Sequence, residues 1–63
     1  MRSSRMMRPK EVSEYTQLPI ASLAKMRMRG DGPHFYKVSR LVIYDLDDIE
    51  VWLEARKRRS TRD

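Results

Sequence analysis

The side chains in this sequence best suited to recognition chemistry recur at helical spacing between positions 20 and 29. Ser22, Lys25 and Arg29 are three and four positions apart, so a helix would place them on one face. Hydroxyl and ammonium groups donate to the edges of DNA bases, and a guanidinium can donate a pair of bonds to guanine. Adjacent cations would hold phosphates. We therefore expect this segment to contact duplex DNA through Ala21, Ser22, Lys25, Arg27, Met28 and Arg29.

A second polar group lies between two short runs of β-forming residues. Residues 35–38 and 41–44 are rich in aromatic and branched side chains, and the pattern predicts a β-hairpin. Lys37, Ser39 and Arg40 would then stand at or beside its tip. Because a cationic tip can enter a minor groove, we expect these residues to contact DNA as well.

The residues offer little for catalysis. The chain has no cysteine, and His34 is its only histidine, with no base or nucleophile close to it in sequence. The acidic cluster at 45–50 lacks the spacing of a calcium loop and is interpreted as the start of a helix. Residues 30–32 lack the Lys-Ser/Thr that follows a phosphate-binding loop, so they predict a turn. We expect no enzymatic activity, no metal site and no cofactor.

Charge is abundant and unevenly distributed. Lys and Arg number 14 against 9 Asp and Glu, giving a net charge of +5 in 63 residues. The basic residues concentrate in 1–10, 25–40 and 56–63, whereas 41–55 is acidic. A polyanion would be attracted to the basic segments, but an ordinary solvated surface and a module that binds an acidic protein remain open alternatives. Three interpretations of the C-terminal cations also stay open: partners of a helix dipole, a DNA-binding tail or a protein contact. These cations are Arg56, Lys57, Arg58 and Arg59.

Three helices are needed to position these groups. Pro9 is typical of a first helical residue, and the sequence around Pro19 predicts the end of that helix. A second helix is expected from Ile20 to Arg29, with Leu23 facing inward and a stop at Gly30.

The third helix is expected to begin with a cap at Asp47 and to bury Ile49, Trp52 and Leu53. The whole chain allows one domain. We predict a flexible basic arm at 1–7, a DNA-binding domain at 8–57 and a basic tail at 58–63. No apolar run is long enough for a membrane span, and the lack of cysteine favours the cytoplasm.

Between residues 8 and 57 the sequence resembles the excisionase family of small proteins, which is related to the DNA-binding domain of MerR-type regulators. Three stretches carry the resemblance: Pro9-Lys10-Glu11-Val12-Ser13-Glu14-Tyr15, then residues 30–38 beginning Gly-Asp-Gly-Pro, and residues 44–56 ending Trp-Leu-Glu-Ala-Arg. The resemblance implies a mainly α fold with a small β-hairpin, a winged helix-turn-helix. It also implies a recognition helix over 21–29 and a wing over 37–40.

Excisionases are recombination directionality factors, which bend attachment-site DNA and help a site-specific integrase to excise a phage genome. The resemblance therefore implies double-stranded DNA and possibly an integrase as partners, head-to-tail self-association on DNA, and a place in the cytoplasm at the nucleoid of a bacterial host. A small transcriptional regulator of the AlpA or MerR type is the alternative. Leu41 and Ile43 stand where the family commonly has basic residues. We expect them to form an exposed apolar strip that contacts another protein.

Overall fold

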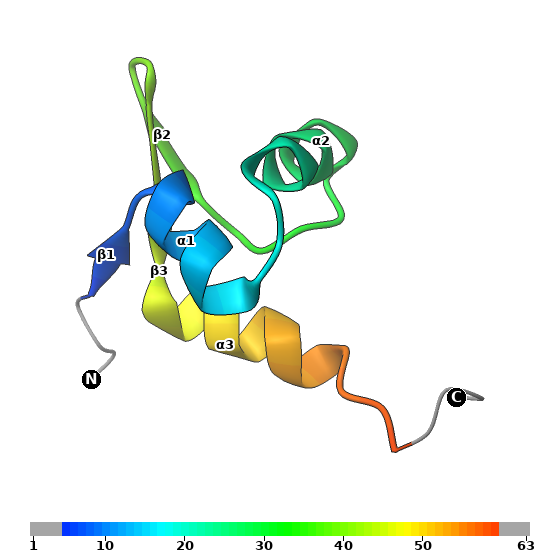
Figure 1. Ribbon diagram of the computed structural model, residues 1–63. Helices are drawn as coiled ribbons and strands as arrows, with labels where there is room; N and C mark the ends of the chain where they lie inside the picture. The colour runs from blue at the N-terminus through cyan, green and yellow to red at the C-terminus, as the bar shows by residue number, and fades with distance from the viewer. Residues whose placement is uncertain (1–4, 60–63) are drawn as a thin grey trace.

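A computed structural model describes residues 5–59, in which three helices pack beside a three-stranded antiparallel sheet (Figure 1). The elements follow in the order β1 (Met6–Met7), α1 (Pro9–Thr16), α2 (Ile20–Arg29), β2 (Tyr36–Val38), β3 (Leu41–Asp45) and α3 (Leu46–Ala55). The predicted succession of two helices, a hairpin and a third helix is confirmed. In Figure 1, α1 occupies the centre, α2 lies above it, α3 lies below it and the sheet stands at its left.

The first two helices begin and end where the sequence predicted. Pro9 is the first residue of α1, and Gln17 ends that helix in the left-handed conformation with φ 68°. Gly30 ends α2 in the same way, with φ 81°, and its N–H donates to the carbonyl of Met26. Both ends therefore satisfy a carbonyl that the helix leaves open.

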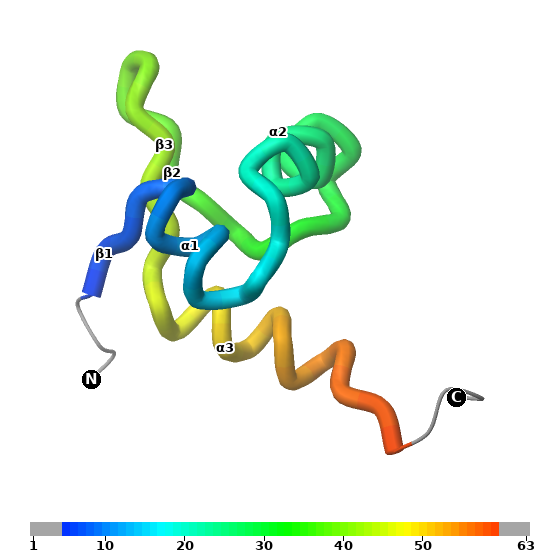
Figure 2. Tube along the Cα trace, viewed as in Figure 1, coloured from blue at the N-terminus to red at the C-terminus, as the bar shows by residue number. Residues whose placement is uncertain are grey.

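Residues 6 and 7 form a strand, so the prediction of a flexible arm over 1–7 is wrong at these two positions. Met7 pairs with Tyr44 and Met6 with Asp45, which adds β1 to the open edge of β3. The Met7 side chain is buried in the core, and burial of that apolar surface holds the strand in place. In Figure 2, the blue β1 segment lies beside the chain that leads into α3. Residues 1–4 of the predicted arm lie outside the described residues.

The exposure of apolar side chains on the outer face of the hairpin differs from expectation. Leu41 and Ile43 are half-buried, so the predicted exposed strip on β3 is wrong. Each lies opposite a residue of β2, Val38 and Tyr36 respectively, and partners in antiparallel strands share a face. The most exposed apolar side chains of this outer face therefore belong to β2, with Val38 59% exposed.

The third helix begins earlier than predicted. Asp45 is its cap, because the Asp45 carboxylate accepts a 2.9 Å hydrogen bond from the backbone N–H of Asp47. The predicted cap at Asp47 is wrong by one half-turn, since β3 runs directly into α3 without an intervening loop.

A small core lies between the sheet and the helices. Its fully buried members come from five elements: Met7, Val12, Leu23, Tyr44 and Ile49. Leu53 packs against this core as predicted, and Trp52 is half-buried. Within residues 5–59, no helix has the length and apolar character needed to cross a bilayer.

Candidate nucleic-acid interface

The outer face of α2 presents most of the predicted DNA-contacting side chains to solvent. Ala21, Lys25 and Arg29 are exposed, and Met28 is 89% exposed. Ser22 is half-buried at the edge of this face. The outward direction follows from Leu23, which is fully buried on the other side of the helix. The Lys25 side chain makes no hydrogen bond or ion pair with the described part of the chain.

Arg27 points the other way, toward the sheet. Its Nη1 donates a 2.7 Å hydrogen bond to the hydroxyl of Tyr44, and its guanidinium carbon lies 5.9 Å from the centre of the Phe35 ring. Phe35 in turn packs against Tyr44, with ring centres 6.1 Å apart. Arg27 is half-buried and joins α2 to the hairpin, so only part of its guanidinium is available to a partner.

A groove of about 520 Å³ separates α2 from the hairpin. Ala24, Arg27 and Met28 line the α2 wall. The opposite wall holds the aromatic ring of Phe35 and the polar residues of the hairpin, and its members are Phe35, Lys37, Ser39, Arg40 and Val42. The structure thus brings all three residues predicted for the hairpin tip to one side of this groove. We call it the α2–hairpin groove.

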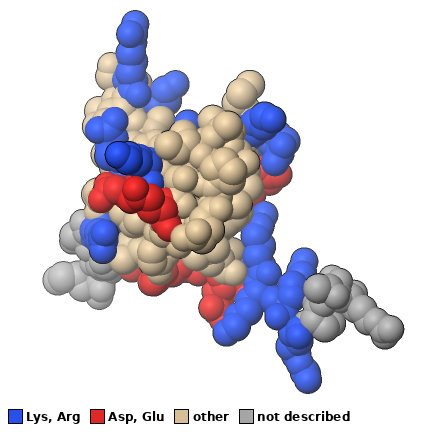
Figure 3. All heavy atoms as spheres, viewed as in Figure 1, with Lys and Arg blue, Asp and Glu red and all other residues tan. Residues whose placement is uncertain are grey.

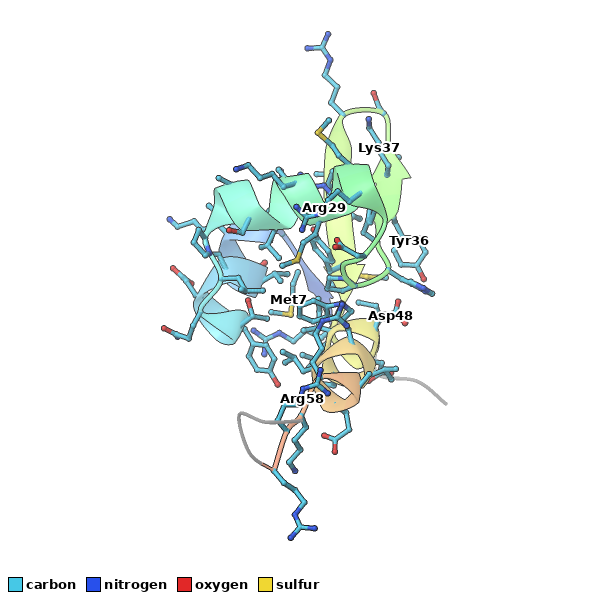
Figure 4. All side chains as sticks on the ribbon, turned by 90° about the vertical axis from the view of Figure 1, so that its right-hand side faces the viewer. Met7, Arg29, Tyr36, Lys37, Asp48 and Arg58 are labelled. Atoms are coloured by element: carbon cyan, nitrogen blue, oxygen red, sulfur yellow. The ribbon has the colours of Figure 1, made fainter. Side chains whose placement is uncertain are left out.

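Lys37 faces this groove because of its register. It lies opposite Val42 on the inner face of the hairpin, whereas Tyr36 and Val38 lie on the outer face. Ser39 occupies the turn with φ 58°, a left-handed conformation that glycine adopts more readily. Figure 4 shows Arg29 and Lys37 at the upper end of the molecule and Arg58 at the lower end.

Charge is unevenly distributed over the surface. In Figure 3, Lys and Arg side chains gather over α2 and the hairpin at the top, whereas acidic side chains lie along the lower side over α3 and in a band at the left over α1. A further blue group lies at the lower right, where α3 ends. A polyanion would therefore meet attraction at the upper end and repulsion along α3.

One acidic residue interrupts the basic upper surface. The Asp31 carboxylate lies 3.2 Å from Nε of Arg29, and both side chains are about half exposed, at 50% and 59%. The Asp31 carbonyl accepts hydrogen bonds from Trp52 Nε1 at 3.2 Å and from Arg56 Nη2 at 2.9 Å. The turn after α2 is thus attached to the end of α3.

The C-terminal cations are exposed, and Arg56 and Lys57 each contact a residue of α3. The Arg56 guanidinium stacks over the Trp52 ring at 4.3 Å, and Lys57 lies 3.9 Å from Glu54. Arg58 and Arg59 follow at the surface. Residues 60–63 of the predicted tail lie outside the described residues, and which role this basic segment has stays a prediction.

A hydrogen bond also joins α1 to α3 on the side away from the groove. The Tyr15 hydroxyl donates to the Glu50 carboxylate at 3.0 Å. This bond, together with desolvation and the negative charge of Glu50, raises the pKa of Tyr15 above its ordinary value. Between residues 5 and 59, no group of three His, Cys, Asp or Glu side chains has the arrangement of a metal site.

Sequence reasoning did not include Asp31, Phe35 or Tyr44 among the functional residues. Apart from the Arg29–Asp31 pair, their side-chain hydrogen bonds and ring contacts join positions 8 to 25 residues apart, which helical or strand periodicity does not reveal. The only sequence signal was the Gly30–Pro33 turn, which predicted a bend but no partner. No known protein-family model matches this chain, and no curated protein shows significant similarity to it.

Proposed function

We propose that this protein binds duplex DNA as a winged helix-turn-helix, with α2 in the major groove and the β2–β3 hairpin against the adjacent minor groove. The observation that carries the proposal is the α2–hairpin groove. Arg27 lines its α2 wall and Lys37 and Arg40 line its hairpin wall. Lys25 and Arg29 lie exposed on the same helix, outside the groove lining. Cations on both sides of a groove suit a phosphate backbone that passes between two contacted DNA grooves.

The acidic lower side supports the same orientation. A duplex placed against α3 would meet carboxylates, whereas one placed against α2 and the hairpin would meet the basic surface (Figure 3). The half-buried position of Arg27 also fits, because its bond to Tyr44 fixes the helix relative to the wing.

Binding to fluorescently labelled duplexes, followed by anisotropy at several salt concentrations, tests this proposal. We expect log K to fall linearly with log salt, because counterions leave the phosphates that the protein neutralises. Lys25→Ala and Lys37→Ala are each expected to weaken binding. Lys57→Ala removes the same charge beyond the end of α3 and outside the lining of the α2–hairpin groove, and it is the matched control, expected to have the smaller effect.

If Lys25→Ala and Lys37→Ala bound duplex DNA as tightly as the wild type, the assignment of α2 and the hairpin as the DNA-binding surface would be overturned. Binding to an acidic protein, with no salt-dependent binding to any duplex, would favour the protein-interaction alternative.

Within DNA binding, we propose an architectural role as an excisionase, supported by the sequence resemblance over residues 8–57. Excision by a site-specific integrase, measured on paired attachment sites with and without this protein, tests the role. Stimulated excision together with DNA bending supports it. Sequence-specific binding that alters transcription from a neighbouring promoter, with no effect on excision, would support the transcriptional regulator instead.

A further inference from the structure

The Arg29–Asp31 pair places an anion within the surface proposed for DNA. Arg29 is the last residue of α2, and its Nε donates to the Asp31 carboxylate at 3.2 Å. A phosphate and a carboxylate accept the same guanidinium donors. A phosphate that approached this end of α2 would therefore meet a donor already in use and a negative charge beside it.

The backbone that carries this carboxylate is held from two sides. Trp52 and Arg56 both donate to the Asp31 carbonyl, and the N–H of Asp31 donates to the carbonyl of Met26 at 3.3 Å. Gly32 adds a steric constraint, since a Cβ at that position would lie 2.8 Å from the Cβ of Met26. The carboxylate thus projects from a turn packed tightly against α2 and α3.

The pair is placed to compete with a ligand from solvent rather than to stabilise the core. Both side chains are half exposed, and an exposed ion pair contributes little to folding. The Asp31 bonds to Trp52 and Arg56 use its carbonyl, so the turn does not require its carboxylate. A phosphate can replace the Asp31 carboxylate as the partner of Arg29. Because the ion pair within the protein must break first, the net free energy gained from that phosphate contact is smaller.

We propose that Asp31 competes with DNA phosphates for Arg29 and so weakens binding to duplex DNA. This inference rests on the proposed DNA binding. The expected ligand is the duplex phosphate backbone, whatever its sequence.

The test is a salt titration of binding to a random-sequence duplex by Asp31→Asn, Arg29→Ala and the double variant. We expect Asp31→Asn to bind about two- to fivefold more tightly than the wild type, in keeping with the strength of an exposed pair. The slope of log K against log salt should steepen by about 0.9, the value for one added phosphate contact. The double variant should lose both effects and bind like Arg29→Ala.

Glu14→Gln provides the matched control, because it removes one exposed negative charge on α1. A gain equal to that of Glu14→Gln, or a gain that persists without Arg29, would show that Asp31 acts only through net charge and would overturn the proposal. Weaker or unchanged binding by Asp31→Asn would overturn it as well.

Folding of the variants is checked by thermal melting, with Asp31→Ser as a second substitution expected to show the same gain. The ¹⁵N-detected Nε–H signal of Arg29 in the free protein gives a readout without DNA, and it should shift in Asp31→Asn. A wild type that binds no duplex at low salt would instead refute the proposed function, an outcome distinct from normal binding with no Asp31 effect.

Discussion

Nη1 of Arg27 donates a 2.7 Å hydrogen bond to the phenolic oxygen of Tyr44, which joins the last turn of α2 to the buried end of β3. The bond fixes the distance between the two walls of the α2–hairpin groove. A charged donor makes a stronger hydrogen bond than a neutral one, and its partner here is a fully buried side chain. A residue chosen from the sequence as a DNA contact therefore also maintains the shape of the proposed interface.

Tyr44→Phe keeps the buried ring and removes only the oxygen that accepts from Arg27. We expect it to lower the free energy of unfolding by about 1–3 kcal/mol, the usual range for a bond to a charged group. Urea denaturation followed by circular dichroism measures the change. Tyr36→Phe is the control, because the Tyr36 ring is 44% exposed on the outer face. Equal stabilities for the two variants would contradict the role given to the Tyr44 hydroxyl.

Met7→Ala tests whether the N-terminal strand belongs to the core. The Met7 side chain is 2% exposed, and truncating a buried methionine costs about 2–5 kcal/mol. Met6→Ala alters the neighbouring residue, which is 46% exposed, and should cost much less. Thermal unfolding of both variants decides the matter. Similar midpoints would mean that residues 6 and 7 behave as the loose arm expected from the sequence.

Asp45→Ala should destabilise the protein by about 0.5–2 kcal/mol, because it removes the cap of α3. Asp47→Ala removes a carboxylate from the first turn of the same helix, where its interaction with the helix dipole is worth about 0.3–1 kcal/mol. Chemical denaturation of the two variants measures which one loses more free energy of unfolding. The reverse order would restore the sequence-based prediction that Asp47 is the cap.

Stability at high pH should depend on Tyr15. Its pKa is raised in the folded protein by the bond to Glu50, so folding is favoured while the hydroxyl is protonated. That contribution is complete below about pH 10, the ordinary tyrosine pKa, and is lost as pH rises through the raised value. In Glu50→Gln, the pKa of Tyr15 should fall toward the ordinary value. Tyrosine ring signals followed by NMR during an alkaline titration measure this pKa. An unchanged Tyr15 midpoint in the variant would refute Glu50 as the cause of the raised pKa.

The first two helices were predictable because local residues determine their ends. Pro9, Pro19 and Gly30 restrict the backbone at fixed positions, and the inward spacing of Leu23 identified the buried face of α2. These are interactions within a few residues, which a sequence pattern records directly.

The sheet and the interface were only partly predictable because their partners are distant. Met6–Met7 has no alternating pattern, and its strand exists through pairing with residues 44 and 45. Lys25 and Arg29 were placed outward correctly from periodicity. The bonds of Arg27 to Tyr44 and of Arg56 to Asp31 depend on the three-dimensional arrangement of elements, which periodicity does not determine.

The strand order β1-β3-β2 has a kinetic consequence. β2 and β3 are joined by a short turn, whereas β1 reaches β3 across the whole of α1, α2 and the hairpin, and closing a longer loop costs more entropy. β1 should therefore dock last during folding and separate first under native conditions. The amide of Leu46, which donates to the carbonyl of Arg5, reports this opening, and its deuterium exchange should outpace that of the hairpin amides.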